Sequence, residues 1–154
     1  MTIVRTVPDD LPFLCELEKV CFSRPWSASA LAETMNGEGA AFYTAREDGI
    51  PVGYVGSFPA GNEREITNIA VSPDHRRRGI GRALLTALIA GMKQRGEERL
   101  LLEVRASNLP ARTLYESIGF VCDGIRKRYY RDPAEDAVLM SLTLNESESF
   151  KGKR

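Results

Sequence analysis

The sequence is poor in the residues that build metal and disulfide sites. It contains one histidine, His75, and three cysteines, Cys15, Cys21 and Cys122, which form no CxxC pair. These are too few ligands for a structural zinc site, so we expect no metal. An odd number of cysteines without a secretion signal is typical of a reducing compartment, which predicts a cytoplasmic protein. The apolar start of the chain is cut short at Pro8, which argues against a signal peptide.

The sequence also lacks an excess of one charge and a long apolar run. Lysine plus arginine and aspartate plus glutamate both number 21 among 154 residues, so the formal net charge is zero. Nucleic-acid-binding proteins usually carry a strong basic excess, so no direct nucleic-acid binding is expected. The longest apolar run, residues 84–92, is interrupted by Thr86 and Gly91 and is far shorter than the ~18 residues of a membrane span. A membrane protein is therefore not expected.

The chain length and the succession of patterns predict one mixed α/β domain. Strand-like segments alternate with segments whose apolar residues recur at three- and four-residue steps. The expected strands are residues 2–7, 40–47, 52–58, 65–71, 100–104, 120–125 and 138–144. The expected helices follow caps at Asp9 or Asp10, at Ser27 and at Asn108, and the third of the four begins near Gly81. The order β-α-α-β-β-β-α-β-α-β-β indicates an α/β (α+β) fold, a single mixed sheet of about seven strands with about four helices on its faces. We expect the domain to span residues 1–144 and to be followed by a polar, frayed C-terminal tail at residues 145–154.

A loop rich in arginine and glycine, residues 76–81, precedes the third long helix. A helix start collects unpaired backbone N–H groups and the positive end of the helix dipole, and both suit an anion. Glycines let the backbone approach a ligand closely, and Arg78 or Arg82 could add charged contacts. Arg82-Ala83 excludes a Walker loop, and Leu84 stands where a dinucleotide fingerprint needs its third glycine. The loop predicts an anion site, with a solvated turn rimmed by arginines as the alternative.

Glu103 is the one ionisable side chain in an almost continuous apolar run, residues 100–104. Such a run is typical of a central strand that is covered on both faces. Ligands of open α/β sheets bind at the carboxyl ends of strands, so a carboxylate there is a candidate general base. The alternative is that Glu103 forms an ion pair with Arg99 or Arg105. The sequence leaves both interpretations open.

Three further residues have both a structural and a functional interpretation. Tyr115 is a candidate proton donor, although a tyrosine at helical spacing is more often an aromatic in the core or at its rim. Asn108 is expected to cap the helix that follows it, and a ligand contact would be additional. Trp26, in the loop between the first two helices, either lines a substrate groove or anchors the loop.

Motifs in a fixed order carry a resemblance to a known family. They are Thr67-Asn68-Ile69-Ala70-Val71, Arg76-x-x-Gly79-x-Gly81 and Asn108-x-x-Ala111-x-x-Leu114-Tyr115-x-x-x-Gly119-Phe120. In this order and spacing they resemble the GNAT superfamily of acetyl-CoA-dependent N-acetyltransferases, from the first strand to about Leu144. Within it, Pro25-Trp26-Ser27, residues 68–71 and 102–108, and Tyr129-Tyr130 followed by Glu135-Asp136-Ala137 are similar to the bacterial ribosomal-protein N-terminal alanine acetyltransferases (RimI-type).

The resemblance implies a splayed sheet and a set of site residues. The fourth and fifth strands would part and leave a V-shaped slot for acetyl-CoA, with the pantetheine arm paired to the fourth strand as an added strand would be. The loop amides would hold the pyrophosphate, and Asn108 would lie near the sulfur. Glu103 would be the base and Tyr115 the acid in a direct attack within a ternary complex. The implied cofactor-binding residues are Ile69, Ala70, Val71, Arg77, Arg78, Gly79, Ile80, Gly81, Arg82 and Asn108.

The implied reaction moves acetyl from acetyl-CoA to the α-amino group of a protein N-terminus, with the N-terminal alanine of a ribosomal protein as the expected acceptor. An α-amino group with a pKa of about 8 is roughly a tenth neutral at pH 7, so one carboxylate can suffice as base and no metal is required. Two alternatives stay open. One is the same enzyme with a lysine side chain or a small-molecule amine as acceptor. The other is a non-catalytic acetyl-CoA-binding or ribosome-associated module that docks through the basic residues 126–131.

Overall fold

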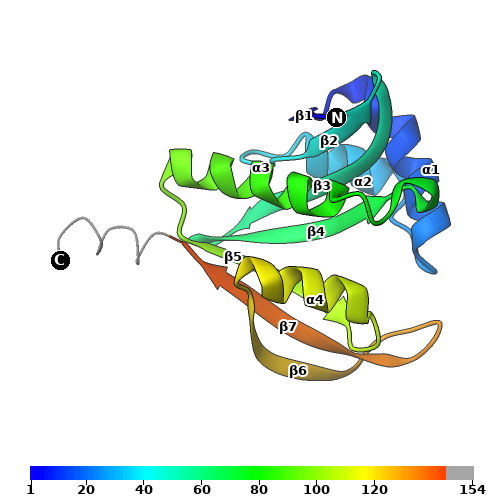
Figure 1. The fold of residues 1–154 in the computed structure, drawn as a ribbon. Helices are drawn as coiled ribbons and strands as arrows, with labels where there is room; N and C mark the ends of the chain where they lie inside the picture. The colour runs from blue at the N-terminus through cyan, green and yellow to red at the C-terminus, as the bar shows by residue number, and fades with distance from the viewer. Residues whose placement is uncertain (145–154) are drawn as a thin grey trace. The chain divides into compact units, whose positions relative to one another are not determined.

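The computed structural model describes residues 1–144, and the tail that was expected to be frayed lies outside the described residues. Their strands form one mixed, open sheet of seven strands in the order β1-β2-β3-β4-β5-β7-β6 (Figure 1). The strands are β1 (Thr2–Arg5), β2 (Tyr43–Glu47), β3 (Ile50–Ala60), β4 (Glu63–Val71), β5 (Arg99–Arg105), β6 (Val121–Tyr130) and β7 (Glu135–Thr143). The helices are α1 (Leu11–Cys21), α2 (Ala28–Met35), α3 (Ile80–Arg95) and α4 (Leu109–Ile118), with short 3-10 turns η1 (Pro8–Asp10) and η2 (Pro73–His75). The predicted fold class and order of elements are confirmed.

The described chain forms two compact units, and both β4 and α3 contribute residues to each of them. Unit 1 comprises Met1–Pro59 and Thr67–Gly91, and unit 2 comprises Ala60–Ile66 together with the chain from Met92 onward. Within unit 2, β4 and β5 run parallel, and their register pairs Glu65 with Leu101. Over the described residues, no helix combines the length and the apolar character needed to cross a membrane.

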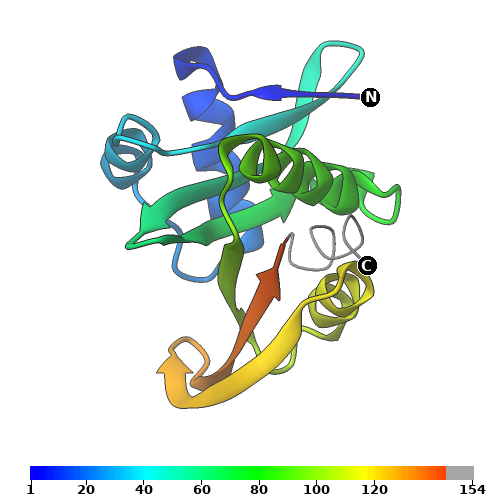
Figure 2. The same ribbon diagram turned by 90° about the vertical axis from the view of Figure 1, so that its left-hand side faces the viewer.

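Helices cover both faces of the strands in unit 1. A Cβ at Gly53 on β3 would lie 3.0 Å from the carbonyl oxygen of Ala70 and 3.4 Å from the side chain of Ile80 on α3, so only glycine fits here without displacement. The next residue, Tyr54, points to the opposite face, because successive side chains of a strand alternate. There it packs with buried leucines of α1 and α2. Figure 2 accordingly shows α1 and α3 on opposite sides of these strands.

In unit 2, α4 packs on one face of β5 and β7. Leu102 on β5 and Met140 on β7 are register partners in an antiparallel ladder, and both are buried. Leu142, two residues further along β7, shares their face. A Cβ at Gly119, which follows the end of α4, would lie 3.2 Å from Leu142 (Figure 1). The helix therefore covers this face and completes the buried layer of unit 2.

The prediction that residues 100–104 form a strand covered on both faces is wrong. β5 is a central strand, since it pairs with β4 and β7, but buried and half-buried residues alternate along it. Leu101 and Glu103 point away from α4 and, with Leu139, line an open pocket. The apolar run was misleading because Leu101 lines this pocket and is not a core residue.

The helix starts show one expected cap and one unexpected arrangement. Ser27 caps α2 as predicted, since its hydroxyl oxygen accepts a hydrogen bond of 3.1 Å from the Ala30 N–H. Asp10 stands at the N-cap position of α1 but does not cap that helix with its side chain. Its buried carboxylate instead accepts from the Val7 N–H at 3.1 Å and pairs with Arg46 at 2.6 Å. Contacts with Val7 and with Arg46 on β2 thus take the place of the predicted cap at the start of α1.

Strand β6 is longer than predicted and forms one edge of the sheet. It continues through Arg126, Lys127 and Arg128, which were expected to lie in the connection to the last strand. Its ladder with β7 shifts register twice, and nearly all of its residues are exposed. A strand exposed on both faces has no apolar alternation, so the sequence pattern gives no signal for it.

A buried ion pair in unit 2 joins β4 to the turn after α3. Arg64 is 2% exposed, and its Nε and Nη2 donate to the two carboxylate oxygens of Glu97 at 2.8 and 3.0 Å. These hydrogen bonds, with a smaller contribution from Arg95, lower the pKa of Glu97 from 4.5 to about 2, although partial burial acts in the opposite direction. The ionised carboxylate is therefore stabilised in the folded state.

Replacing this carboxylate should destabilise the protein in a pH-dependent way. We expect Glu97→Gln to lower the free energy of unfolding at pH 7 by about 2 kcal/mol, after allowance for solvent screening. Because the folded pKa is depressed, this contribution is fully present above pH 4.5 and is lost as the pH falls toward 2. Urea denaturation at pH 7 and pH 3 measures both effects. The exposed neighbour variant Glu98→Gln should change stability by less than ~0.5 kcal/mol, and equal values for the two variants at pH 7 would contradict the assignment.

Candidate functional site

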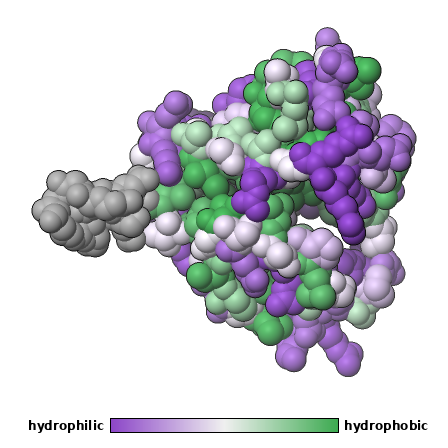
Figure 3. Space-filling model, in the orientation of Figure 1, coloured by the Kyte–Doolittle hydropathy of each residue, from purple (hydrophilic) through white to green (hydrophobic). Residues whose placement is uncertain are grey.

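The loop before α3 offers backbone donors on one side of unit 1. Arg77 and Gly79 adopt positive φ angles of 64° and 79°, and α3 begins at Ile80. Left-handed residues of this kind occur in the backbone nests that bind anions, and the first N–H groups of a helix have no partner within it. A Cβ at Gly79 would meet no described atom within 4 Å, so this side of the loop is open. Figure 3 shows hydrophilic side chains gathered over this end of α3.

Two arginine side chains of the loop, those of Arg76 and Arg78, contact other parts of unit 1. The Arg78 guanidinium lies 3.1 Å from the Glu47 carboxylate, an exposed pair that an incoming anion can replace at small cost. Arg76 donates from Nε to the carbonyl oxygen of Val71 at 3.2 Å and contacts the sulfur of Cys21 at 3.3 Å. The last carbonyl of β4 is thus already bonded within the protein. The backbone amides of the loop are therefore the donors best placed for a phosphate.

A fully buried carboxylate, which the sequence motifs did not single out, links α1 to β3 and β4. Glu18 is 0% exposed, and its Oε1 accepts a hydrogen bond of 2.9 Å from the Trp26 N–H. Its Oε2 accepts from the Tyr54 hydroxyl and, at 2.9 Å, from Nδ2 of Asn68. Burial, and next the charge of Glu18, raise the pKa of Tyr54, so the phenol stays protonated and donates. The network fixes Asn68, which immediately precedes Ile69 in the predicted cofactor strand.

The sequence did contain a signal for this network. Glu18 falls on the apolar stripe of α1, four residues after Leu14 and three before Cys21, where a charge needs buried partners. The same network also bears on Trp26. Its backbone is held by Glu18, and its side chain packs against the core of unit 1. These contacts are those of a residue that anchors the loop.

Glu103 lies on the face of β5 opposite α4, with its side chain 24% exposed. Its Oε2 is 3.7 Å from Nη1 of Arg126, and Glu103 raises the pKa of the Tyr129 phenol. The suggested ion pair with Arg99 or Arg105 is wrong, because these arginines pair with acidic residues on β4 and β7. The sequence could not show this, since the partner of Glu103 comes from β6 through the sheet topology.

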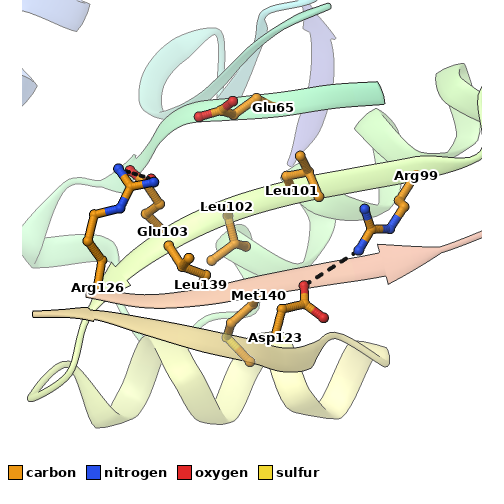
Figure 4. Close-up of a pocket in the computed structure, with 9 residues that line it drawn as sticks. All are labelled: Glu65, Arg99, Leu101, Leu102, Glu103, Asp123, Arg126, Leu139 and Met140. Carbon is orange, nitrogen blue, oxygen red and sulfur yellow. Dashed lines mark ion pairs between the residues drawn. The ribbon is translucent and has the colours of Figure 1, made fainter. Parts of the chain in front are cut away.

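Glu103 lines a pocket of about 270 Å³ that lies within unit 2 (Figure 4). The lining residues are Glu65, Arg99, Leu101, Leu102, Glu103, Asp123, Arg126, Leu139 and Met140. Arg126 and Glu103 face each other at one end, and Arg99 and Asp123 form a second ion pair at the other. Burial raises the pKa of Glu65, the charge of Glu103 raises it further, and Arg126 lowers it. The pocket therefore has an apolar middle and an ion pair at each end, and the candidate base belongs to one of these pairs.

Tyr115 is held on α4, on the other face of the unit 2 strands. It is 5% exposed, and its ring packs against Phe120 with the centroids 5.6 Å apart. Burial, with a smaller effect from Tyr130, raises the pKa of Tyr115, so the phenol carries its proton at neutral pH. Burial raises the pKa of Tyr130, and the charge of Glu103 raises it further. Asn108 caps α4 as predicted, since its Oδ1 accepts from the Ala111 N–H at 3.3 Å.

The predicted site residues divide between the two units. Unit 1 brings together nine of the implied cofactor-binding residues, from β4 and the loop and first turn of α3: Ile69, Ala70, Val71, Arg77, Arg78, Gly79, Ile80, Gly81 and Arg82. Unit 2 holds Glu103, Asn108 and Tyr115. Within residues 1–144, no three or more His, Cys, Asp or Glu side chains are grouped so that they could hold a metal ion.

Comparisons with known proteins point to one family. The family described as acetyltransferase (GNAT) matches residues 11–120. The chain is 38% identical to the ribosomal protein bS18-alanine N-acetyltransferase of Escherichia coli strain K12, over 94% of this chain and 98% of the relative. The crystal structure of the ribosomal-protein-S18-alanine N-acetyltransferase from Escherichia coli has a TM-score of 0.87 at 38% identity, covering 94% of each chain. The crystal structure of Ard1 from Thermoplasma volcanium has a TM-score of 0.85 at 25% identity, covering 94% of this chain and 98% of the other.

Loss of the buried carboxylate should destabilise unit 1 strongly. We expect Glu18→Ala to lower the free energy of unfolding by about 3 kcal/mol or more, because the buried Tyr54 hydroxyl and two partly buried donors lose their acceptor. Glu16→Ala is the matched control, since Glu16 is an exposed residue of the same helix that pairs with Lys19 at 3.6 Å. Its effect should stay below ~0.5 kcal/mol. Denaturant unfolding of both variants decides the point, and a small loss for Glu18→Ala would show that the network contributes little.

Proposed function

Because the chain belongs to the GNAT family of acetyltransferases, we propose that it transfers acetyl from acetyl-CoA to the α-amino group of a protein N-terminus. The proposed acceptor is the N-terminal alanine of a ribosomal protein, as the names of the full-length relatives suggest. The observation that carries the proposal in this chain is the position of Glu103, a partly exposed carboxylate that lines a pocket beside Arg126. A general base needs such access to the acceptor.

Unit 1 has the groups that acetyl-CoA would require. The amides from Arg77 to Arg82 would hold the pyrophosphate at the start of α3. Backbone groups of Ile69, Ala70 and Val71 would pair with the pantetheine arm as an added strand. The Val71 carbonyl is bonded to Arg76, so we expect the other peptide groups of this segment to make those contacts. When bound, acetyl-CoA supplies an activated acetyl group as a thioester.

Glu103 and Tyr115 would then handle the protons. Glu103 would accept a proton from the acceptor nitrogen, directly or through a water. An α-amino group, with a pKa of about 8, needs less help from a base than a lysine amine with a pKa of about 10.4. Tyr115 is protonated at neutral pH, because burial raises its pKa, and it would donate its phenolic proton to the departing sulfur. Asn108, whose Oδ1 caps α4, would contact the cofactor through Nδ2.

The role of Glu103 predicts a selective loss of turnover. With a short alanine-initiated peptide as acceptor, Glu103→Gln should lower kcat by about 100-fold and leave the KM for acetyl-CoA within about twofold. The mass shift of the peptide measures transfer. A peptide with a blocked N-terminus and a free lysine should stay unmodified, and efficient transfer to it would favour the lysine alternative. Unchanged turnover in Glu103→Gln would remove Glu103 from the role of base.

The role of Tyr115 as proton donor predicts that removing its hydroxyl also lowers turnover. Tyr115→Phe keeps the ring that packs on Phe120 and removes the proton donor, so kcat should fall by about 10- to 100-fold while acetyl-CoA still binds. Tyr43→Phe, which removes a phenol from β2 in unit 1, is the control and should leave kcat unchanged. Equal turnover in Tyr115→Phe and the wild type would assign Tyr115 to packing alone.

A further inference from the structure

The Glu103 end of the pocket carries more negative than positive charge. Glu65 comes from β4, Glu103 from β5 and Arg126 from β6, and all three lie in unit 2 (Figure 4). Glu65 is the register partner of Leu101, and Glu103 follows Leu101 by two residues, so the two carboxylates lie on the same face. Two carboxylates beside one guanidinium leave one negative charge without a counter-charge. This end of the pocket therefore suits one additional cation.

The other end of the pocket carries the same formal excess, two carboxylates beside one guanidinium, but there the guanidinium is held more closely. There, Arg99 lies 2.6 Å from the Glu63 carboxylate and 3.7 Å from Asp123, and it also donates to Ser141. These contacts fix the guanidinium between its acidic neighbours. A ligand cation at this end would have to displace Arg99 from these contacts. The pair of Glu65 and Glu103 is therefore the more accessible acceptor.

Arg126 is held more loosely at the Glu103 end. Its one ion-pair contact with Glu103 is 3.7 Å long, and its side chain is 54% exposed. The guanidinium also lies over the Tyr129 ring, with its carbon 4.9 Å from the centroid. An exposed ion pair of this length contributes little stability, and stacking on Tyr129 can hold the arginine after the pair is broken. A cationic ligand can therefore displace Arg126 at small cost.

We propose that Glu65 and Glu103 together bind the ammonium group of the acceptor, and that Arg126 occupies this position until the acceptor displaces it. The inference rests on the proposed function, which makes the acceptor an α-amine. At pH 7 about nine-tenths of such amines are protonated, so a carboxylate pair captures the abundant form. Glu103 then accepts one proton: an N–H bond breaks, an O–H bond forms on the carboxylate, and the nitrogen keeps the electron pair. Glu65 stays ionised and keeps the acceptor in place.

The environment of Glu65 agrees with a binding role. Burial and the neighbouring Glu103 make its ionised form unfavourable in the free protein, and they raise its pKa. A cation between the two carboxylates removes this repulsion. Clefts in which carboxylates are held close together are typical of functional sites, because packing alone does not favour them.

Steady-state kinetics of two variants test the inference, one that removes a negative charge from the site and one that removes a positive charge. At saturating acetyl-CoA and varied alanine-initiated peptide, Glu65→Gln should raise the KM for peptide about tenfold and leave kcat and the KM for acetyl-CoA within about twofold. Arg126→Gln should lower the KM for peptide, because it removes the competing cation. Glu116→Gln, which makes the same charge change at an exposed position on α4, should leave the KM for peptide unchanged. A KM unaffected by Glu65→Gln, or raised equally by Glu116→Gln, would overturn the inference.

Binding measurements separate this inference from the proposed function. Calorimetry with CoA present gives the Kd of the free peptide and of the same peptide with an acetylated N-terminus. Glu65→Gln should weaken the free peptide about tenfold and leave the blocked peptide unchanged, with melting temperatures within about 2 °C of the wild type. Wild-type binding without acetyl transfer would refute the proposed function and still support the carboxylate pair. A wild-type protein that binds both peptides equally would overturn the inference whatever its activity.

Discussion

The alternation of side chains along β5 is the constraint on which the candidate catalytic site depends. Leu102 is fixed on the buried face by Met140 and α4, so the neighbouring Glu103 has to point into the pocket. A shift of one residue in the pairing with β7 would bury the carboxylate and expose the leucine, at a cost of several kcal/mol. The apolar contacts of unit 2 thus place the base. The chemistry is determined by packing on the opposite side of the same strand.

Each unit also contains a buried charge that holds a segment next to the candidate site. Glu18 in unit 1 accepts three hydrogen bonds, and Arg64 in unit 2 donates twice to Glu97. Buried ion pairs and buried carboxylates seldom add much net stability, because desolvation offsets the attraction. Their value lies in specificity, since an alternative packing would leave the charge without its partners. Here Glu18 holds the segment next to Ile69, which is proposed to bind the cofactor. Arg64 precedes Glu65, which is proposed to bind the acceptor.

The sequence was sufficient where a feature depends on residues close in the chain. The caps at Ser27 and Asn108 and the order of the strands follow from local patterns, and the structure confirms them. The motifs likewise led to the family. The predicted cofactor contacts and proton-transfer roles remain predictions, because they concern a bound ligand.

The failures concern contacts between segments far apart in the chain. The partner of Glu103 comes from β6, and the carboxylate of Asp10 is taken by Arg46 on β2. The half-exposed face of β5 could not be seen in its composition, because Leu101 is apolar and yet lines a pocket. A sequence pattern indicates which helix or strand a residue belongs to. It does not indicate which residue, distant in the chain, will contact its side chain in the folded protein.

The irregular edge strand β6 has a consequence for how the protein behaves among other chains. A straight strand at a sheet border offers unpaired peptide groups that a foreign strand can extend into a fibril. β6 departs from that geometry at two register shifts, and it carries positively charged side chains along the irregular part. Both features disfavour intermolecular strand addition. The strand that supplies Arg126 to the pocket thus presents an edge that is poorly suited to pairing with a second copy of itself.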